Sequence, residues 1–244
     1  MRARLVERID GTVGTSAVGH EQVGELDRRE QRVLGDRHVV MALEALEIGS
    51  AVAPSRAFGA YSGQLFELRR RQNRLHVYRM KDGTLEPAPA YALDTLAEPQ
   101  NVRPAQRAGT LHVHPNGRYL YVANRASGTT ESDGRTVFAG GENNIAVYSL
   151  SERAGKPALI QHVDSGGFVP RTFAIDPSQS VLVTASIKPL PLRQGSEIVS
   201  VPAAISVFRI QADGTLAFER NYDIETNGGI QYWMGIVGPQ SETA

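Results

Sequence analysis

The fold is decided by one stretch, Leu111-His-Val-His-Pro-Asn-Gly-Arg-Tyr-Leu-Tyr-Val-Ala-Asn-Arg125, which is typical of two short strands joined by a tight turn. Apolar and polar side chains alternate on both sides of Pro115-Asn-Gly117, as they do in half-buried strands. Proline presets one backbone angle, and Asn-Gly tolerates the left-handed conformations that hairpin turns require. The stretch therefore predicts a hairpin whose second strand ends in Asn124 and Arg125, which bring an amide and a guanidinium to one end of a sheet.

Weaker copies of this pattern recur along the chain. Three segments align with one another, and each is followed by a turn: Leu75-His-Val-Tyr-Arg-Met80, Ile145-Ala-Val-Tyr-Ser-Leu150 and Ile205-Ser-Val-Phe-Arg-Ile210. The hairpin itself recurs as Phe173-Ala-Ile-Asp-Pro-Ser-Gln-Ser-Val-Leu-Val-Thr184. A repeated order of hairpin, strand, turn and strand predicts an all-β protein built from the four-stranded antiparallel blades of a β-propeller. A β-sandwich is the alternative, and it is disfavoured because whole four-strand units repeat.

The first part of the chain differs in character from the rest. Residues 1–73 hold charge clusters without strand periodicity, and only Asp36–Glu47 is compatible with a short amphipathic helix. The basic run Arg69-Arg-Arg71 is typical of a solvated surface. We therefore predict an irregular, poorly ordered or short-helical segment over 1–73, propeller blades over 74–237 and a tail over 238–244. Within the blades, Ala126–Gly141 predicts a long loop rich in Gly, Ser and Thr.

Composition excludes several classes of function. The 244 residues include no cysteine, so disulfides, thiolate catalysis and Cys-ligated metals are excluded. Net charge is zero, with 26 basic and 26 acidic residues, so no global field attracts nucleic acid or anionic lipid. No apolar run approaches the roughly 20 residues of a membrane span, and the N-terminus lacks the apolar core of a secretory signal. We expect a cytoplasmic protein without nucleic-acid or membrane partners.

Four segments together resemble the lactonase-type seven-bladed propellers, a family that includes the propeller-type 6-phosphogluconolactonases and the fungal carboxymuconate lactonizing enzymes. The matching segments are His112–Arg125, Glu142–Tyr148, Pro170–Pro177 and Ile205–Ile210. In the family this order belongs to the last blades, so the resemblance implies an incomplete propeller of about two and a half blades. It also implies hydrolysis of a sugar-acid or related lactone without a cofactor. The histidine and the Arg–Glu pair that the family places in earlier blades have no intact copy here, so a truncated, inactive form or a non-catalytic scaffold is the alternative.

The chemistry of lactone hydrolysis suggests two catalytic residues. The reaction needs a base that activates water and positive charge for the oxyanion and any substrate anion. Arg125 matches the family's Asn-Arg position, and its planar fork suits an anion; the alternative is a guanidinium that only ties blades together. Glu142 is the candidate base, and the alternative is a turn former at the start of a strand.

Four further residues are predicted to bind substrate: His112, His114, Asn124 and Arg171. The two histidines stand two apart on a strand and therefore share a face. No third ligand stands at a matching position, so we predict no metal. The absence of Gly-x-Ser-x-Gly argues against a serine esterase. Trp233, the single tryptophan, is expected to pack between blades. Uncovered faces of the end blades predict self-association.

Overall fold

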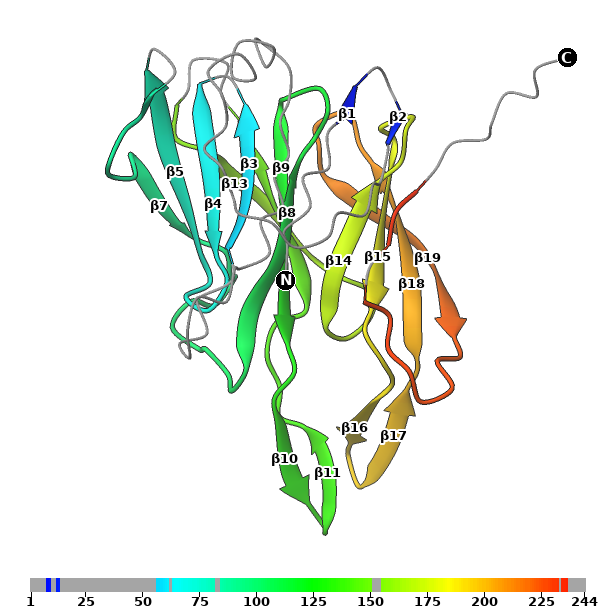
Figure 1. Cartoon of the computed structure of the whole chain (residues 1–244). Helices are drawn as coiled ribbons and strands as arrows, with labels where there is room; N and C mark the ends of the chain where they lie inside the picture. The colour runs from blue at the N-terminus through cyan, green and yellow to red at the C-terminus, as the bar shows by residue number, and fades with distance from the viewer. Residues whose placement is uncertain are drawn as a thin grey trace, which may run out of the picture.

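Three antiparallel sheets fan out side by side in this protein (Figure 1). The computed structural model describes residues 8–9, 12–13, 56–61, 63–81, 84–150, 155–232 and 234–236, and every regular element in this part of the chain is a strand. It therefore contains no helix that is long and apolar enough to span a membrane. The helix predicted over Asp36–Glu47 and the packing predicted for Trp233 lie outside the described residues.

Each of the three sheets is a propeller blade with four main strands in chain order, and the first sheet has a short fifth strand. The first blade contains β3 Arg56–Tyr61, β4 Gln64–Arg69, β5 Arg74–Lys81 and β7 Tyr91–Asp94, and the two-residue strand β6 Thr84–Leu85 also pairs with β5. The second contains β8 Gln106–Val113, β9 Tyr119–Ala126, β12 Asn144–Ser149 and β13 Ala158–Asp164. The third contains β14 Pro170–Ile175, β15 Val181–Ser186, β18 Ala203–Ile210 and β19 Leu216–Ile224. Val77, Val147 and Val207 lie on the third strand of their blades, which confirms the repeat inferred from the sequence.

The first blade begins upstream of residue 74, which corrects the boundary drawn from the sequence. Strands β3 and β4 fall within the segment predicted to be irregular, and by pairing with β5 they complete the blade of which only the part after residue 74 was predicted. Phe66, Glu67 and Leu68 are consecutive and all buried. A strand that is buried on both faces shows no alternation of polar and apolar residues, so periodicity does not reveal it. The remaining short strands of the N-terminal region are β1 Arg8–Ile9 and β2 Thr12–Val13, which pair with each other.

The loop predicted over Ala126–Gly141 contains a hairpin instead. Its strands are β10 Thr129–Ser132 and β11 Arg135–Phe138, and a second hairpin, β16 Leu190–Gln194 with β17 Glu197–Val201, occupies the same place in the third blade. Asp133 and Gly134 at the first tip have φ of 52° and 71°, the left-handed backbone of a tight hairpin turn. Both hairpins extend from the same end of their blades (Figure 1), which we call the hairpin end.

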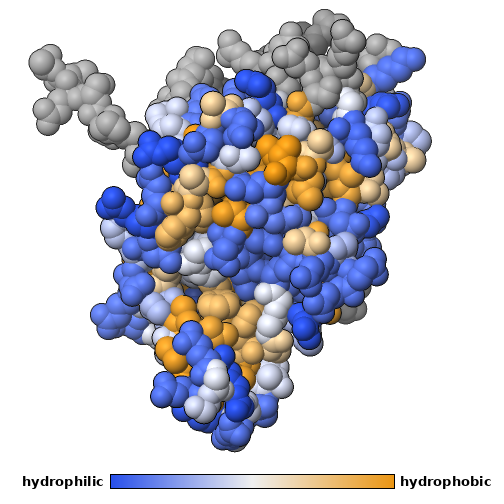
Figure 2. Space-filling model, turned by 180° about the vertical axis from the view of Figure 1, so that it is seen from behind, coloured by the Kyte–Doolittle hydropathy of each residue, from blue (hydrophilic) through white to orange (hydrophobic). Residues whose placement is uncertain are grey.

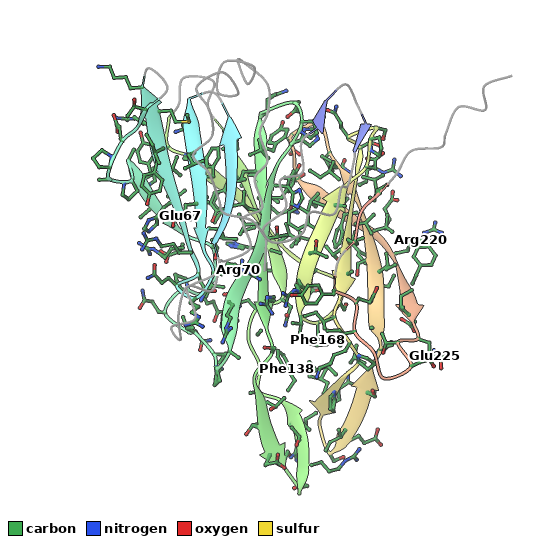
Figure 3. All side chains as sticks on the ribbon, in the orientation of Figure 1. Glu67, Arg70, Phe138, Phe168, Arg220 and Glu225 are labelled. Atoms are coloured by element: carbon green, nitrogen blue, oxygen red, sulfur yellow. The ribbon has the colours of Figure 1, made fainter. Side chains whose placement is uncertain are left out.

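Strand β11 of the first hairpin lies beside β16 of the second, and contacts across the boundary between blades also reach the loop before β14. The rings of Phe138 and Phe168 meet edge to face with centroids 5.0 Å apart (Figure 3). Arg193 Nη1 lies 2.9 Å from Asp133 Oδ2, and Val137 is buried. From behind, apolar residues gather near the lower end of the molecule, and a second group of apolar residues lies higher on the same face between hydrophilic areas (Figure 2). The two hairpins therefore connect the second and third blades outside the main sheets.

The core consists of two layers, one between each pair of adjacent blades. The layer between the first and second blades contains Phe66, Leu68, Leu75, Val77, Ala108, Leu111, Val113, Leu120, Val122, Ala146 and Tyr148. The layer between the second and third contains Tyr119, Tyr121, Ala123, Ile145, Val147, Phe173, Leu182, Phe208 and Leu216. Strand β9 contributes alternate residues to both layers, as expected of a strand with two buried faces. A residue of β9 therefore packs against the first blade or the third, according to the face of the strand on which its side chain lies.

Candidate anion-binding site

Four arginines from three blades lie at the hairpin end and influence one another. Arg107 and Arg125 belong to the second blade, Arg171 begins the third, and Arg70 follows β4 of the first, near the centre of the molecule (Figure 3). Burial lowers the pKa of Arg125 to about 10, with further contributions from the positive charges of Arg70, Arg171 and Arg107. This group of four residues is referred to below as the arginine cluster.

Two members of the arginine cluster lie opposite each other on paired strands. Arg107 of β8 and Arg125 of β9 are direct partners in the antiparallel register. Directly opposed side chains are close neighbours on one face of a sheet, and like charges at such positions are destabilising. Arg125 Nε is buried and has no hydrogen-bond partner among the residues described. An anion placed between these side chains relieves both the repulsion and the missing hydrogen bond.

Two β-bulges bring Arg171 to the same place. In β8 the register shifts between Ala108 and Leu111, and in β14 it shifts between Pro170 and Thr172, so Arg171 is the extra residue. A bulge re-aims a side chain and is common beside functional sites. A Cβ on Gly109 would lie 2.9 Å from the Pro170 carbonyl oxygen, so glycine is needed for this close approach of β8 and β14.

Arg70 is held against the same bulge from the first blade. The Ala108 N–H donates to the Arg70 carbonyl oxygen over 2.9 Å, and Arg70 Nε lies 3.4 Å from the Ala108 carbonyl oxygen. The turn after β4 is thereby fixed to β8. The bulge in β8 thus adjoins residues of all three described blades.

The Asn124 and Glu142 side chains lie on the other face of the second blade. Asn124 Nδ2 donates to Asn144 Oδ1 over 2.8 Å, and Asn144 Nδ2 donates to Glu142 Oε2 over 2.7 Å. The carboxylate of Glu142 also accepts from the N–H groups of Ala97 and Glu98, both at 2.8 Å. Consecutive residues of a strand point to opposite faces, so this network faces the first blade while Arg125 faces the third. The structure therefore does not bring Asn124 or Glu142 together with Arg125.

The two predicted histidines both turn toward the third blade, but neither reaches the arginine cluster. His112 is half-buried against Phe173, with ring centroids 4.6 Å apart, and burial lowers its pKa to about 4. It pairs with Tyr121, four residues before Arg125 on β9, which places it roughly 13 Å along the strand. His114 lies at the opposite end of the blade, where Nδ1 accepts from the Asn116 N–H and Nε2 lies 3.0 Å from the Gln179 carbonyl oxygen.

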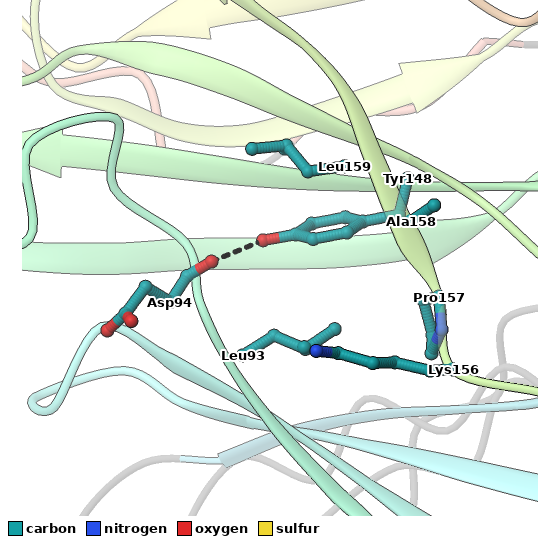
Figure 4. A pocket seen from close by; sticks show the side chains of 7 residues that line it. All are labelled: Leu93, Asp94, Tyr148, Lys156, Pro157, Ala158 and Leu159. Carbon is teal, nitrogen blue, oxygen red and sulfur yellow. Dashed lines mark hydrogen bonds between the residues drawn. The ribbon is translucent and has the colours of Figure 1, made fainter.

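An outer groove between the first and second blades is a second candidate for a ligand-binding site. It has a volume of about 360 Å³ and is lined by Leu93, Asp94, Tyr148 and Lys156–Leu159 (Figure 4). Tyr148 Oη donates to the Asp94 carbonyl oxygen over 2.6 Å, and the Asp94 carboxylate lies 2.5 Å from Arg74 Nη1. The Asp94 carboxylate, the acidic group of this groove, is therefore already paired with Arg74. We place the candidate site at the arginine cluster, where charge of one sign accumulates.

The arginine cluster has the chemistry of an anion site. Guanidinium forks bind carboxylate and phosphate groups through two parallel hydrogen bonds. Among the described residues, no three His, Cys, Asp or Glu side chains come close enough together to hold a metal ion. The prediction from the sequence included Arg125 and Arg171 but missed Arg70 and Arg107. Arg70 belongs to a run interpreted as solvated surface, and Arg107 becomes notable only once the register places it opposite Arg125.

The comparisons with known proteins agree with the fold. The family model described as Lactonase, 7-bladed beta-propeller matches residues 49–188. The 6-phosphogluconolactonase of Formosa agariphila is 32% identical over 80 residues, which are 33% of this chain and 19% of that protein. The 6-phosphogluconolactonase of Bacillus subtilis is 29% identical over 90 residues, 37% of this chain and 22% of that protein. The chain thus covers about a fifth of the length of these relatives.

Solved structures show the same architecture at low identity. The periplasmic gluconolactonase of Pseudomonas aeruginosa superimposes with a TM-score of 0.51 at 18% identity, over 75% of this chain and 43% of that one. A protein from Lactobacillus plantarum superimposes with a TM-score of 0.50 at 15% identity, over 75% of this chain and 48% of that one. At such identities the likeness concerns the fold alone, and it covers less than half of each neighbour.

Proposed function

Since the chain belongs to the lactonase family of seven-bladed β-propellers, we propose that it binds an anionic sugar lactone similar to 6-phosphogluconolactone and supports its hydrolysis by attack of water. The observation that carries the proposal is the arginine cluster. Arg107 and Arg125 oppose each other, and neither has an ion-pair partner among the residues described. A phosphate or carboxylate of the substrate supplies the missing negative charge.

Arg125 is the central anion-binding residue of this proposal. It lies opposite Arg107 and is influenced by Arg70 and Arg171, so a bound anion is stabilised from three blades. Such an anion is present in both the substrate and the transition state. A clamp that acts on both states lowers KM and raises kcat/KM. His112 is neutral at physiological pH because of its lowered pKa, and it is a candidate for the less charged part of the substrate.

The general base is the second requirement. The base expected from the sequence, Glu142, accepts three hydrogen bonds from the protein and lies on the face away from Arg125. These contacts support a structural role, so its catalytic role remains a prediction. A positioned base typically contributes about 10²–10⁴-fold to the rate. We therefore expect the blades described to bind anions more effectively than they hydrolyse lactones, which keeps the non-catalytic binding scaffold as a second candidate.

Hydrolysis and binding are best measured with a charged and an uncharged lactone. We expect this chain to prefer 6-phosphogluconolactone over gluconolactone, because only the former carries a phosphate. Arg125→Ala should lower kcat/KM for the phosphorylated lactone by roughly 10-fold or more and raise its KM, since a charged hydrogen bond contributes about 1.5–3 kcal/mol. Arg118→Ala is the matched control, because this exposed arginine lies at the opposite end of the same hairpin.

The outcomes separate the two candidates. Slow hydrolysis with the phosphorylated substrate preferred supports the lactonase. Tight binding of the phosphorylated lactone without any turnover supports the scaffold. Equal kcat/KM and equal affinity for the two lactones would contradict the arginine cluster as the substrate site. Equal effects of Arg125→Ala and Arg118→Ala would contradict it as well. The cytoplasmic location and the self-association expected from the sequence are further predictions; sedimentation of the purified chain tests the latter.

A further inference from the structure

The chain after the last blade crosses the hairpin end and reaches the arginine cluster. Gln231 fixes this segment to the end of β15: its N–H donates to the Ile187 carbonyl oxygen over 2.7 Å, and its Nε2 donates to the Ser186 carbonyl oxygen over 2.8 Å. These two hydrogen bonds determine the position of the next residue, Tyr232.

Tyr232 contacts Arg171 in two ways at once. Its ring centroid lies 3.9 Å from Arg171 Cζ, within the distance of a cation–π contact. Arg171 Nη2 also donates a hydrogen bond to Tyr232 Oη over 2.6 Å. The ring contact holds the guanidinium in position, and the phenol oxygen occupies one of its donor directions. The Tyr232 side chain is nevertheless half exposed, so it is accessible to a ligand.

The phenol oxygen stands where an anion oxygen would bind Arg171. A neutral oxygen is a weaker acceptor for a guanidinium than the charged oxygen of a phosphate. Phosphate near neutral pH carries about 1.5 to 2 negative charges and offers three or four acceptor oxygens. It is therefore able to engage Arg125 and Arg107 and still replace Tyr232 Oη at Arg171.

We propose that Tyr232 sets the affinity of the arginine cluster for phosphate: its ring orients Arg171, and its hydroxyl occupies the place of an anion oxygen until a phosphate group displaces it. The inference rests on the proposed anion site and names the ligand class as phosphate or a phosphate monoester. The ring and the hydroxyl have opposite effects on affinity. The ring favours binding by orienting a donor, and the hydroxyl opposes binding by competing for that donor.

Two substitutions separate these effects in the full chain, with inorganic phosphate as the probe and titration calorimetry in a phosphate-free buffer as the measurement. Tyr232→Phe keeps the ring and removes the competitor, so we expect phosphate to bind roughly 3- to 10-fold more tightly, the worth of about one net hydrogen bond. Tyr232→Ala loses the ring as well and should bind phosphate at least about 3-fold more weakly than Tyr232→Phe. Tyr222→Phe is the control, because Tyr222 is equally exposed and lies beside Arg220 on the outer strand β19.

Failure of this inference is distinguishable from failure of the proposed function. If Tyr232→Phe binds phosphate no more tightly than the parent, the hydroxyl does not compete and the inference is overturned. If Tyr232→Phe and Tyr232→Ala bind equally, the ring does not orient Arg171 and the inference is also overturned. If Arg125→Ala leaves phosphate affinity unchanged, the arginine cluster is not the anion site, and the proposed function falls with it.

Discussion

The two faces of the second blade treat polar groups in opposite ways at the hairpin end. Toward the first blade, Asn124, Asn144 and Glu142 form a chain of hydrogen bonds that ends on two backbone N–H groups. Toward the third blade, Arg107 and Arg125 lie opposite each other as like charges. Asn124 and Arg125 are consecutive residues, so a single step along β9 separates these two environments.

This difference distinguishes polar side chains that stabilise the fold from polar side chains that are available to bind a ligand. Buried polar groups that serve the fold have protein partners, because an unpaired group costs about 1–3 kcal/mol. The network around Glu142 largely obeys this rule, because the Glu142 carboxylate and the Asn144 side chain are bonded and only Asn124 Oδ1 is buried without a partner among the described residues. The arginine cluster does not, because Arg125 Nε is buried without a hydrogen-bond partner among the described residues. A site that lowers stability without a ligand and gains it with one is typical of functional surfaces.

The largest expected effect concerns the hydrogen-bonded face. Glu142→Ala removes the acceptor of two backbone N–H groups and of Asn144 Nδ2, so we expect the free energy of unfolding to fall by about 2–4 kcal/mol. Urea unfolding followed by far-UV circular dichroism measures this change. Glu131→Ala is the control, since the exposed Glu131 accepts a hydrogen bond from Thr136 within its own hairpin and has no other side-chain partner among the described residues. Unchanged stability combined with abolished lactone hydrolysis would instead identify Glu142 as the base.

An intermediate effect is expected from His112, which faces the third blade. Its pKa is about 4 in the folded chain, below the ordinary value of 6.5, so the unfolded chain takes up a proton first as pH falls. Relative to His112→Phe, the free energy of unfolding of the parent should therefore be constant above pH 6.5. It should fall by about 1–3 kcal/mol as the pH is lowered from 6.5 to 4. Parallel curves for both proteins across this range would show that His112 titrates normally.

The smallest effect has the opposite sign. Arg125→Leu removes one of two opposed cations, so we expect stability in phosphate-free, low-salt buffer to rise by about 0.5–1 kcal/mol. Phosphate should stabilise the parent, by about 2.7 kcal/mol at 100 times its Kd, and leave the variant unaffected. Thermal unfolding with and without phosphate measures both changes. A variant that is markedly less stable than the parent would show that the guanidinium serves the fold.

The blades were predictable from sequence because their strands are long and repeated. Alternation in the hairpin of residues 111–125 and the recurrence of Val77, Val147 and Val207 identify β5, β8, β9, β12 and β18. Strand β4 was missed because both of its faces are buried. The hairpin β10–β11 was missed because its four-residue strands are exposed, although Asp133-Gly134 is a hairpin turn signal.

The candidate site was less predictable than the fold, because it depends on register between strands. Arg125 followed from its position at a strand end. The pairing of Arg107 with Arg125 requires the alignment of β8 with β9, and the position of Arg171 depends on a bulge. The separation of Glu142 from Arg125 likewise depends on Asn144 pairing with Asn124. Side chains from three blades meet through such alignments, which no local pattern specifies.

The distance between the tips of the two hairpins depends on the angle between the second and third blades. Gly134 and Gly195 mark their two tips, and a side chain added at either position would meet no other atom within 4 Å. The first tip belongs to the second blade and the second tip to the third, so a small tilt of one blade against the other is amplified at the tips. Spectroscopic labels attached beside these glycines would therefore report whether ligand capture at the arginines is accompanied by rotation between blades or leaves the framework rigid.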